Sequence, residues 1–331
     1  RYSSSAASDV YKRQSVRLGH DALRQRGQLQ GRHWRPQVLA QELWGLSMSE
    51  SMLARWPDFL ELTKPRVVAL MLITAVIGMC MAVPGFVPWQ PLVLGNIGIA
   101  LCAGAAAAIN HVVDERIDQK MSRTTNRPVA QGRVSQSEAI AFATLLAILG
   151  TALLATTVNV LTAVLTVASL VGYAFIYTMF LKRATPQNIV IGGLAGAAPP
   201  LLGWTAVTGE IHAHGLLLVL IIFAWTPPHF WALAIHRKEE YAAVGIPMLP
   251  VTHGNRFTAL HILLYTILMF LITLLPYITL LSGWIYAVAA TLLGLRFLYW
   301  SVEILREKNP DAPMATFKFS ITYLMVLFIV M

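Results

Sequence analysis

Nine runs of about twenty mostly apolar residues constrain this chain more than any other feature of its sequence. A helix rises about 1.5 Å per residue, so a run of this length crosses the roughly 30 Å hydrocarbon core of a bilayer. The runs lie near residues 66–84, 91–112, 138–157, 160–181, 188–208, 215–235, 258–281, 283–302 and 315–331. We therefore predict an all-α, polytopic membrane protein with nine transmembrane helices.

The composition agrees with this class and excludes several others. Hydrophobic residues make up 56% of the 331 residues and charged residues 12%, whereas a soluble domain carries roughly a quarter charged residues. The composition excludes a soluble globular enzyme, a disordered chain and a collagen, and we expect no nucleic-acid partner. The bilayer itself is the expected environment.

Basic residues in the connections between runs predict the orientation. The connections 85–90, 158–159, 209–214 and 282 contain no Lys or Arg. The alternate connections and their edges carry thirteen, at positions 116, 120, 123, 127, 133, 182, 183, 237, 238, 256, 306, 308 and 318. Because basic loops stay on the inner side of the membrane, we predict a cytoplasmic N-terminus and an active site facing the cytoplasm. A mitochondrial inner membrane remains open, and we favour a bacterial inner membrane because Met48 is a credible start.

Both ends of the chain differ from this pattern. Residues 1–47 contain eight basic and three acidic residues and no long apolar run, so they are neither a signal peptide nor a span. Met48 is a plausible start, and we expect residues 1–47 to be a non-native or disordered basic leader before a transmembrane domain of residues 48–331. We also expect the domain to be truncated at Met331, which ends an apolar run.

A stripe of polar residues lies at the end of the second run. Asn110, Asp114 and Asp118 recur every four residues, so on a helix their side chains point the same way. Oxygen ligands suit Mg²⁺, which commonly binds one or two carboxylates and the phosphates of a substrate. Arg123 and Arg127 follow, and guanidinium groups match phosphate oxygens. A solvated helix end with internal ion pairs is the alternative, but polar groups at the edge of a span are usually functional.

These residues also carry a resemblance to a known family. The pattern Asn-x3-Asp-x3-Asp, then Met-x-Arg-Thr-x2-Arg-Pro, resembles the UbiA-type intramembrane prenyltransferases and, within them, the branch that farnesylates haem. Further matching stretches are 62–66, 181–193, 203–209, 225–235 and 246–251, and the resemblance runs from about Phe59 to Met331. It implies a UbiA-type bundle around a central cavity.

The resemblance also implies an activity and its substrates. A farnesyl group would pass from farnesyl diphosphate to a vinyl group of haem b, with addition of water. Mg²⁺ would be the cofactor, with Asp114, Asp118 and Asn110 as its ligands, and Arg123 and Lys182 would share the catalysis. A haem A synthase or a terminal-oxidase assembly would be the protein partner.

Prolines and glycines predict where the cavity lies. Residues 192–200 contain three glycines and a proline pair, and Pro227 and Pro228 fall near the middle of the sixth run. Proline removes a backbone donor, and broken helices at membrane depth are tolerated beside a sheltered cavity. We therefore expect the fifth and sixth spans to be interrupted around a central cavity, although close helix packing alone also explains the glycines.

Histidines and charges follow the second proline pair. His229, His236 and Glu240 would share one stripe of a continuing helix, flanked by Phe230 and Trp231. A buried histidine is often only a hydrogen-bonded core residue; given the resemblance, His229 becomes the candidate to contact the iron or the porphyrin. We expect Trp231, His236 and Glu240 to contribute to substrate binding.

The second long inner connection lacks a second pair of aspartates four residues apart. Neither Glu239 nor Glu240 has an acidic partner at that spacing, so at most one of them would touch metal. Arg237 and Lys238 would instead offset diphosphate charge or hold the haem propionates. Nearer the fourth span, Arg127, Tyr177 and Arg183 are the remaining expected substrate contacts, and Arg183 is equally explained as an anchoring charge.

Two other functions remain open at this stage. A quinone-type aromatic prenyltransferase would need no iron ligand, and a non-enzymatic haem or lipid carrier would release no diphosphate. In the prenyltransferase mechanism, aromatic side chains could steady the allylic cation by about 1–2 kcal/mol each. The candidates are Tyr173, Tyr177, Phe223, Trp225 and Phe230.

Overall fold

The computed structural model describes residues 55–331, and the predicted leader at residues 1–47 lies outside them. The described part of the chain is helical and contains no strand. Its elements are α3 (Trp56–Leu62), α4 (Pro65–Ala82), the π-helix η1 (Pro91–Gly95), α5 (Asn96–Asp118), α6 (Gln136–Thr157), α7 (Val160–Val171), the π-helix η2 (Gly172–Leu181), α8 (Lys182–Ala184), α9 (Asn188–Ala197), α10 (Pro199–Thr208), α11 (Ala213–His236), α12 (Lys238–Ala243), α13 (Leu249–Ile278), α14 (Trp284–Arg306) and α15 (Ala312–Ile329).

The prediction of nine spans is confirmed. Over residues 55–331, nine helical segments are long and apolar enough to cross a membrane, so the chain is an integral membrane protein. The second span extends to Asp118, six residues past the predicted end, and carries the whole polar stripe on α5. The seventh begins earlier than predicted, at Leu249, because a short helical turn joins it through a kink at Gly254 (φ 84°).

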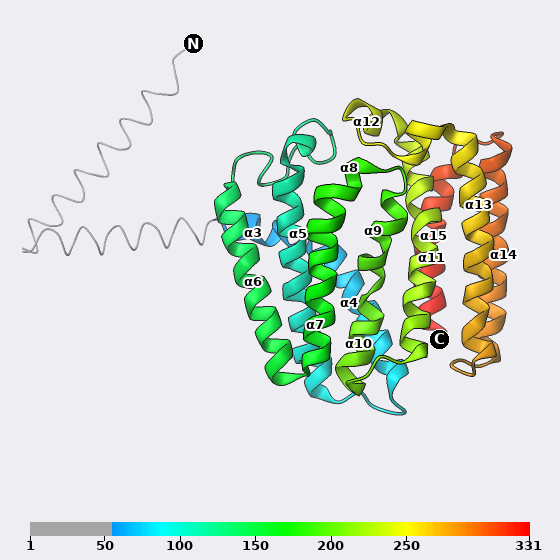
Figure 1. Ribbon diagram of the computed structural model, residues 1–331. Helices are drawn as coiled ribbons and strands as arrows, with labels where there is room; N and C mark the ends of the chain where they lie inside the picture. The colour runs from blue at the N-terminus through cyan, green and yellow to red at the C-terminus, as the bar shows by residue number, and fades with distance from the viewer. Residues whose placement is uncertain (1–54) are drawn as a thin grey trace, which may run out of the picture. The chain divides into compact units, whose positions relative to one another are not determined.

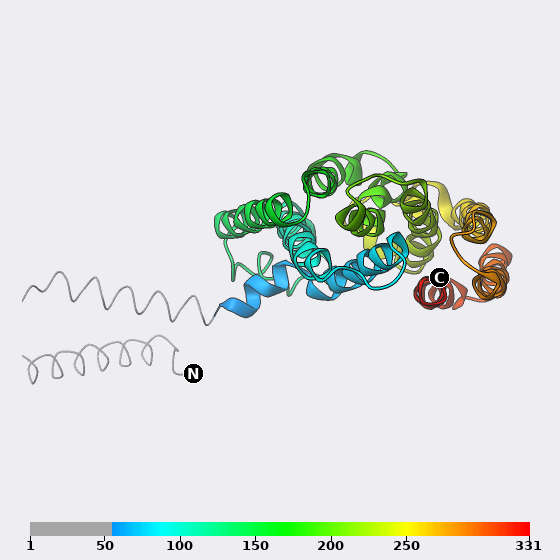
Figure 2. The same cartoon turned by 90° about the horizontal axis from the view of Figure 1, so that it is seen from below.

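The helices form a ring with a second group beside it (Figures 1 and 2). Around the ring, α4 packs against α5 and α10, α5 against η2, η2 against α9, and α9 against α11. In the second group, α13 and α15 pack on α11, and α14 packs on α13 and α15. Helix α11 therefore belongs to both halves, and it is the most buried of the nine spans.

Two glycines allow α4 and α10 to cross at very short range. A Cβ atom on Gly203 would lie 1.9 Å from the carbonyl oxygen of Ala75, and one on Gly78 would lie 2.1 Å from that of Pro200. No side chain fits at either crossing point. Small residues at such contacts let membrane helices pack through their backbones.

Of the two predicted interruptions, one is confirmed and one is wrong. The fifth span is divided into α9 and α10 on either side of Ala198. In contrast, α11 continues through Pro227 and Pro228 without a break. Its burial between both halves of the molecule supports the helix where the proline nitrogens donate no hydrogen bonds.

Candidate functional site

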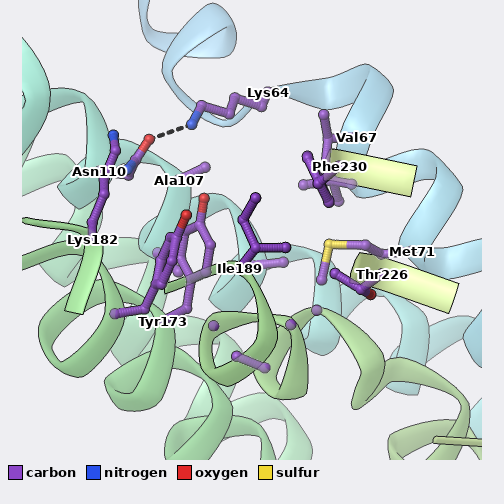
Figure 3. A pocket seen from close by; sticks show the side chains of 18 of the residues that line it. Lys64, Val67, Met71, Ala107, Asn110, Tyr173, Lys182, Ile189, Thr226 and Phe230 are labelled. Atoms are coloured by element: carbon purple, nitrogen blue, oxygen red, sulfur yellow. Dashed lines mark hydrogen bonds between the residues drawn. The ribbon is translucent and has the colours of Figure 1, made fainter. Parts of the chain in front are cut away.

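One cavity of about 600 Å³ lies inside the ring, and its wall is charged and polar at one end and apolar at the other. Figure 3 shows Lys64, Asn110 and Lys182 close together, while Val67, Met71 and Phe230 lie on another side of the pocket. Lys64 directly precedes α4, Asn110 lies in the second half of α5, and Lys182 is the first residue of α8. The cavity thus joins a charged mouth to an apolar interior.

The stripe on α5 is buried, and one carboxylate oxygen at its centre is held by two hydrogen bonds. Asp114 is 2% exposed, and its Oδ2 accepts hydrogen bonds from Lys182 Nζ at 2.5 Å and Asn110 Nδ2 at 2.8 Å. Asn110 Oδ1 in turn accepts from Lys64 Nζ at 2.5 Å. Two lysines from distant parts of the sequence therefore bind the stripe: Lys64 lies 46 positions before Asn110, and Lys182 lies 68 positions after Asp114.

The last carboxylate of the stripe has its own cation. Asp118 is 3% exposed and pairs with Arg127 at 2.6 Å, from NH1 to Oδ2. The Thr124 hydroxyl donates to the Asp118 carbonyl at 3.2 Å and ties the following loop to the end of α5. Arg123 lies on that loop, is exposed, and lines the cavity. The expected basic residues after the stripe are thus at the charged mouth.

The carboxylates fit a hard divalent cation bound together with a phosphate ligand. Asp114 Oδ1 is buried and has no hydrogen-bond partner among the described residues. No group of three or more His, Cys, Asp or Glu side chains that could hold a metal occurs within residues 55–331. The described residues therefore offer two carboxylates and an amide oxygen, and a bound Mg²⁺ would complete its ligand set with substrate oxygens or water.

Lys64 is a site residue that the sequence analysis did not single out. It caps α4 in a left-handed conformation (φ 51°, ψ 59°), which costs a non-glycine residue about 1–2 kcal/mol. Burial first, and then the nearby Arg127 charge, lower the pKa of Lys64 to about 7; a bound anion would favour its protonated form. The sequence feature that could have indicated this role is a lysine followed by a proline at the start of an apolar run.

The fourth span changes from an α-helix to a ten-residue π-helix where it faces the cavity. Within η2, Thr178 Oγ1 donates to the Tyr173 carbonyl at 2.8 Å, and the rings of Tyr173 and Tyr177 stack at 5.6 Å between centroids. Both rings line the cavity. Such π-helical segments are rare and often lie at functional sites; the sequence gives no periodicity signal for one.

His229 lies at the apolar side of the cavity, on α11. It lines the cavity and is 7% exposed. Its ring stacks against Trp225 at 4.2 Å and Phe317 at 4.6 Å between centroids, and its Nδ1 lies 2.6 Å from Ser320 Oγ. Phe230, 43% exposed, also lines the cavity. The predicted histidine and one of its flanking aromatics therefore reach the same space as the carboxylate stripe.

Other predicted contacts lie outside the cavity wall. Trp231 is fully buried and meets Tyr265 edge-on. The stripe from His229 to Glu240 is interrupted because α11 ends at His236 and a new helix, α12, begins at Lys238. His236 is exposed, and Glu240 pairs with Arg237 at 3.3 Å.

Two basic residues and one tyrosine complete this end of the bundle. Lys238 does not line the cavity, and Arg183 is exposed and donates to the Val113 carbonyl at 3.3 Å. Tyr241, which the sequence analysis did not name, does line the cavity. Burial raises the pKa of its hydroxyl, so at neutral pH Tyr241 remains a hydrogen-bond donor.

Similar proteins are consistent with this geometry. The model of the UbiA prenyltransferase family matches residues 71–326. The protoheme IX farnesyltransferase of Saccharophagus degradans is 65% identical over 285 residues, which cover 86% of this chain and 94% of that protein. The protoheme IX farnesyltransferase of Marinobacter nauticus is 67% identical over 276 residues, covering 83% and 91% respectively.

Solved structures of low identity share the fold. A structure described as digeranylgeranylglyceryl phosphate synthase has a TM-score of 0.72 at 20% identity, over 84% of this chain and 97% of that one. A UbiA homologue from Archaeoglobus fulgidus, solved with GPP and Mg²⁺ bound, has a TM-score of 0.57 at 16% identity, over 82% and 99%. The predicted fold class, a nine-span bundle of this type, is confirmed.

Proposed function

The chain belongs to the UbiA prenyltransferase family, and we propose that it transfers the farnesyl group of farnesyl diphosphate to a vinyl group of haem b. Water adds to the second vinyl carbon, so the products are hydroxyethylfarnesyl haem and diphosphate. The observation that carries this proposal is a single cavity with a carboxylate and cation cluster at one end and a histidine among aromatic rings at the other. The two relatives above, 65% and 67% identical, bear the corresponding name.

The charged mouth binds the diphosphate. Lys182 and Arg127 pair with Asp114 and Asp118 before the substrate enters, and Lys64 and Arg123 add further positive charge. Donors already oriented toward the site of developing charge stabilise a leaving group without reorganisation in the transition state. Asp114, Asp118 and Asn110 would hold Mg²⁺, which would supply positive charge to the departing diphosphate.

The apolar part of the cavity holds the farnesyl chain as its bond to oxygen breaks. The allylic carbon becomes cationic, and aromatic faces stabilise a desolvated cation by about 1–2 kcal/mol each. Tyr173, Tyr177, Trp225 and Phe230 line the cavity, and we assign this role to them. Phe223 packs instead against the core formed by α11 and its neighbours.

The haem occupies the cavity beside His229. The terminal carbon of a vinyl group attacks the allylic carbon, and the positive charge moves to the vinyl carbon attached to the porphyrin. Water then bonds to that carbon and loses a proton, which balances the reaction. Excluding water until the new carbon–carbon bond has formed keeps the allylic cation from simple hydrolysis.

The protein lies in a bacterial inner membrane, and its active site opens on the cytoplasmic side. The carboxylate stripe, Lys182 and Arg127 lie at the end of the bundle that also carries α8, α12 and the basic connections. Basic connections remain on the cytoplasmic side. The same reasoning places the N-terminus in the cytoplasm.

The decisive experiment uses the full chain in lipid nanodiscs with haem b, farnesyl diphosphate and Mg²⁺. Extracted haem should gain the mass of one farnesyl group and one hydroxyl, in equal amount to the diphosphate released. Omission of Mg²⁺ should stop both. Diphosphate release that requires an aromatic acceptor other than haem would instead favour a quinone-type prenyltransferase, and haem binding without any diphosphate release would favour a carrier.

A further inference from the structure

A chain of three polar atoms links α11 to α15 behind His229. Nδ1 of His229 lies 2.6 Å from Ser320 Oγ, and Ser320 Oγ lies 2.6 Å from the Phe317 carbonyl oxygen. Ser320 is fully buried. Both distances are short enough for a hydrogen bond, so each pair needs one proton between its atoms.

The direction of these two bonds determines the tautomer of the histidine. A carbonyl oxygen can only accept, so the hydroxyl of Ser320 must donate its single proton to Phe317. The same hydroxyl then has only lone pairs for the histidine, and Nδ1 must carry a proton. In a neutral imidazole with Nδ1 protonated, Nε2 has a free lone pair.

The ring that carries this lone pair is held in one orientation. Trp225 and Phe317 stack on it with interplanar angles of 19° and 27°. Trp225 Nε1 donates to the Ser320 backbone carbonyl at 2.8 Å, so the stacking residue and the hydroxyl are fixed to each other. No described residue hydrogen-bonds Nε2, and His229 lines the cavity.

We propose that Ser320 is a positioning residue that holds His229 in the Nδ1-protonated tautomer, so that Nε2 coordinates the haem iron. The proposal rests on the proposed function, which identifies haem b as the molecule that receives the farnesyl group. A metal-bound histidine almost always donates its other ring proton to a protein acceptor, which fixes the ring and strengthens it as a ligand. Here the hydrogen-bond acceptor is the Ser320 hydroxyl on α15, which lies 91 residues after His229 in the sequence.

Haem binding without farnesyl diphosphate tests this assignment directly. The full chain in nanodiscs is titrated with haem b, and the iron–imidazole stretch of the reduced complex is recorded by resonance Raman spectroscopy. The wild-type protein should show this band, and Ser320→Ala should weaken haem affinity by about 10- to 100-fold and lower the band's frequency, because Nδ1–H loses its acceptor. Ser320→Thr, which restores a hydroxyl, should recover both values.

A serine at a matched position supplies the control. Ser301 on α14 is also fully buried and donates to a carbonyl of its own helix, that of Phe297 at 3.0 Å, but it does not line the cavity. Ser301→Ala should leave haem affinity and the Raman band unchanged. A general loss of packing would instead affect Ser301→Ala and Ser320→Ala alike, which would overturn the proposal.

Two further results would also overturn the assignment. One is a wild-type complex without an iron–imidazole band, and the other is a Ser320→Ala protein with unchanged affinity and frequency. Either result leaves farnesyl transfer measurable by product mass, so the proposed function can still stand. Conversely, a wild-type protein with the band but no farnesylated product would contradict the proposed function while supporting the histidine ligand.

Discussion

The contact between α9 and η2 leaves no room for a side chain at Gly192. A Cβ atom there would lie 2.1 Å from Tyr177 Cδ2 and 2.4 Å from Cε2, whereas ordinary contacts are 3.4–4 Å. Gly192→Ala must therefore displace the Tyr177 ring by more than 1 Å. Because Tyr177 stacks on Tyr173 and both rings line the cavity, the displacement changes the cavity wall.

The expected cost follows from two opposing terms. Replacing a helical glycine by alanine stabilises the helix by about 1 kcal/mol, while overpacking a tight contact costs about 1–3 kcal/mol. Gly196 is one turn along the same helix, also lines the cavity, and a Cβ atom there has nothing within 4 Å. Gly196→Ala measures the first term alone, so Gly192→Ala should be less stable than Gly196→Ala by about 1–3 kcal/mol.

Denaturation of both variants in detergent, together with turnover in nanodiscs, measures this difference. Gly192→Ala should lose stability and turnover, and Gly196→Ala should keep both. Removing the obstructing ring should relieve the clash, so the double variant with Tyr177→Ala should be more stable than the sum of the single changes by about 0.5–3 kcal/mol. Equal stability of the two glycine variants, or strict additivity with Tyr177→Ala, would refute the reasoning.

Three further predictions concern the charged mouth. Asp114→Asn removes the buried charge of a proposed Mg²⁺ ligand and should lower kcat by about 10²–10³-fold, with loss of the Mg²⁺ response in the product assay; a normal Mg²⁺ titration would contradict the ligand assignment. Lys64→Ala should raise the KM for farnesyl diphosphate about tenfold, the equivalent of one charged hydrogen bond, whereas the exposed Lys120→Ala should leave it unchanged. Arg127→Lys keeps the charge but loses the guanidinium fork, and kcat/KM should fall about tenfold; wild-type kinetics would show that only the charge matters.

Much of this architecture follows from local sequence features. Runs of bilayer length predict the nine spans because hydrocarbon requires internally bonded backbone, and the four-residue spacing of Asn110, Asp114 and Asp118 predicts one buried stripe. Both depend on residues close together in the chain. The proline pair at 227 and 228 was misleading, since the effect of a proline depends on the surrounding packing, and α11 is buried on both sides.

The missed residues depend on contacts between distant segments. Lys64 meets Asn110 across 46 positions, and Ser320 meets His229 across 91. The π-helix η2 begins where an ordinary apolar run continues, so neither hydropathy nor spacing marks it. Likewise, Glu240 was placed on a stripe with His229 because the end of α11 at His236 has no sequence signal as strong as a proline.

The ion pairs explain how two carboxylates remain buried before any substrate binds. A single buried charge without a partner destabilises a protein by several kcal/mol, and Asp114 and Asp118 each have one cation within 2.6 Å. These four groups are together neutral, so Arg123 at the same mouth leaves an excess of positive charge, to which Lys64 adds when a bound anion favours its protonated form. That excess attracts an anionic headgroup, whereas a neutral lipid gains nothing from it. The charge balance therefore favours a phosphate-bearing ligand at the mouth, and the apolar wall deeper in the cavity suits an apolar chain attached to it, as in the proposed farnesyl diphosphate.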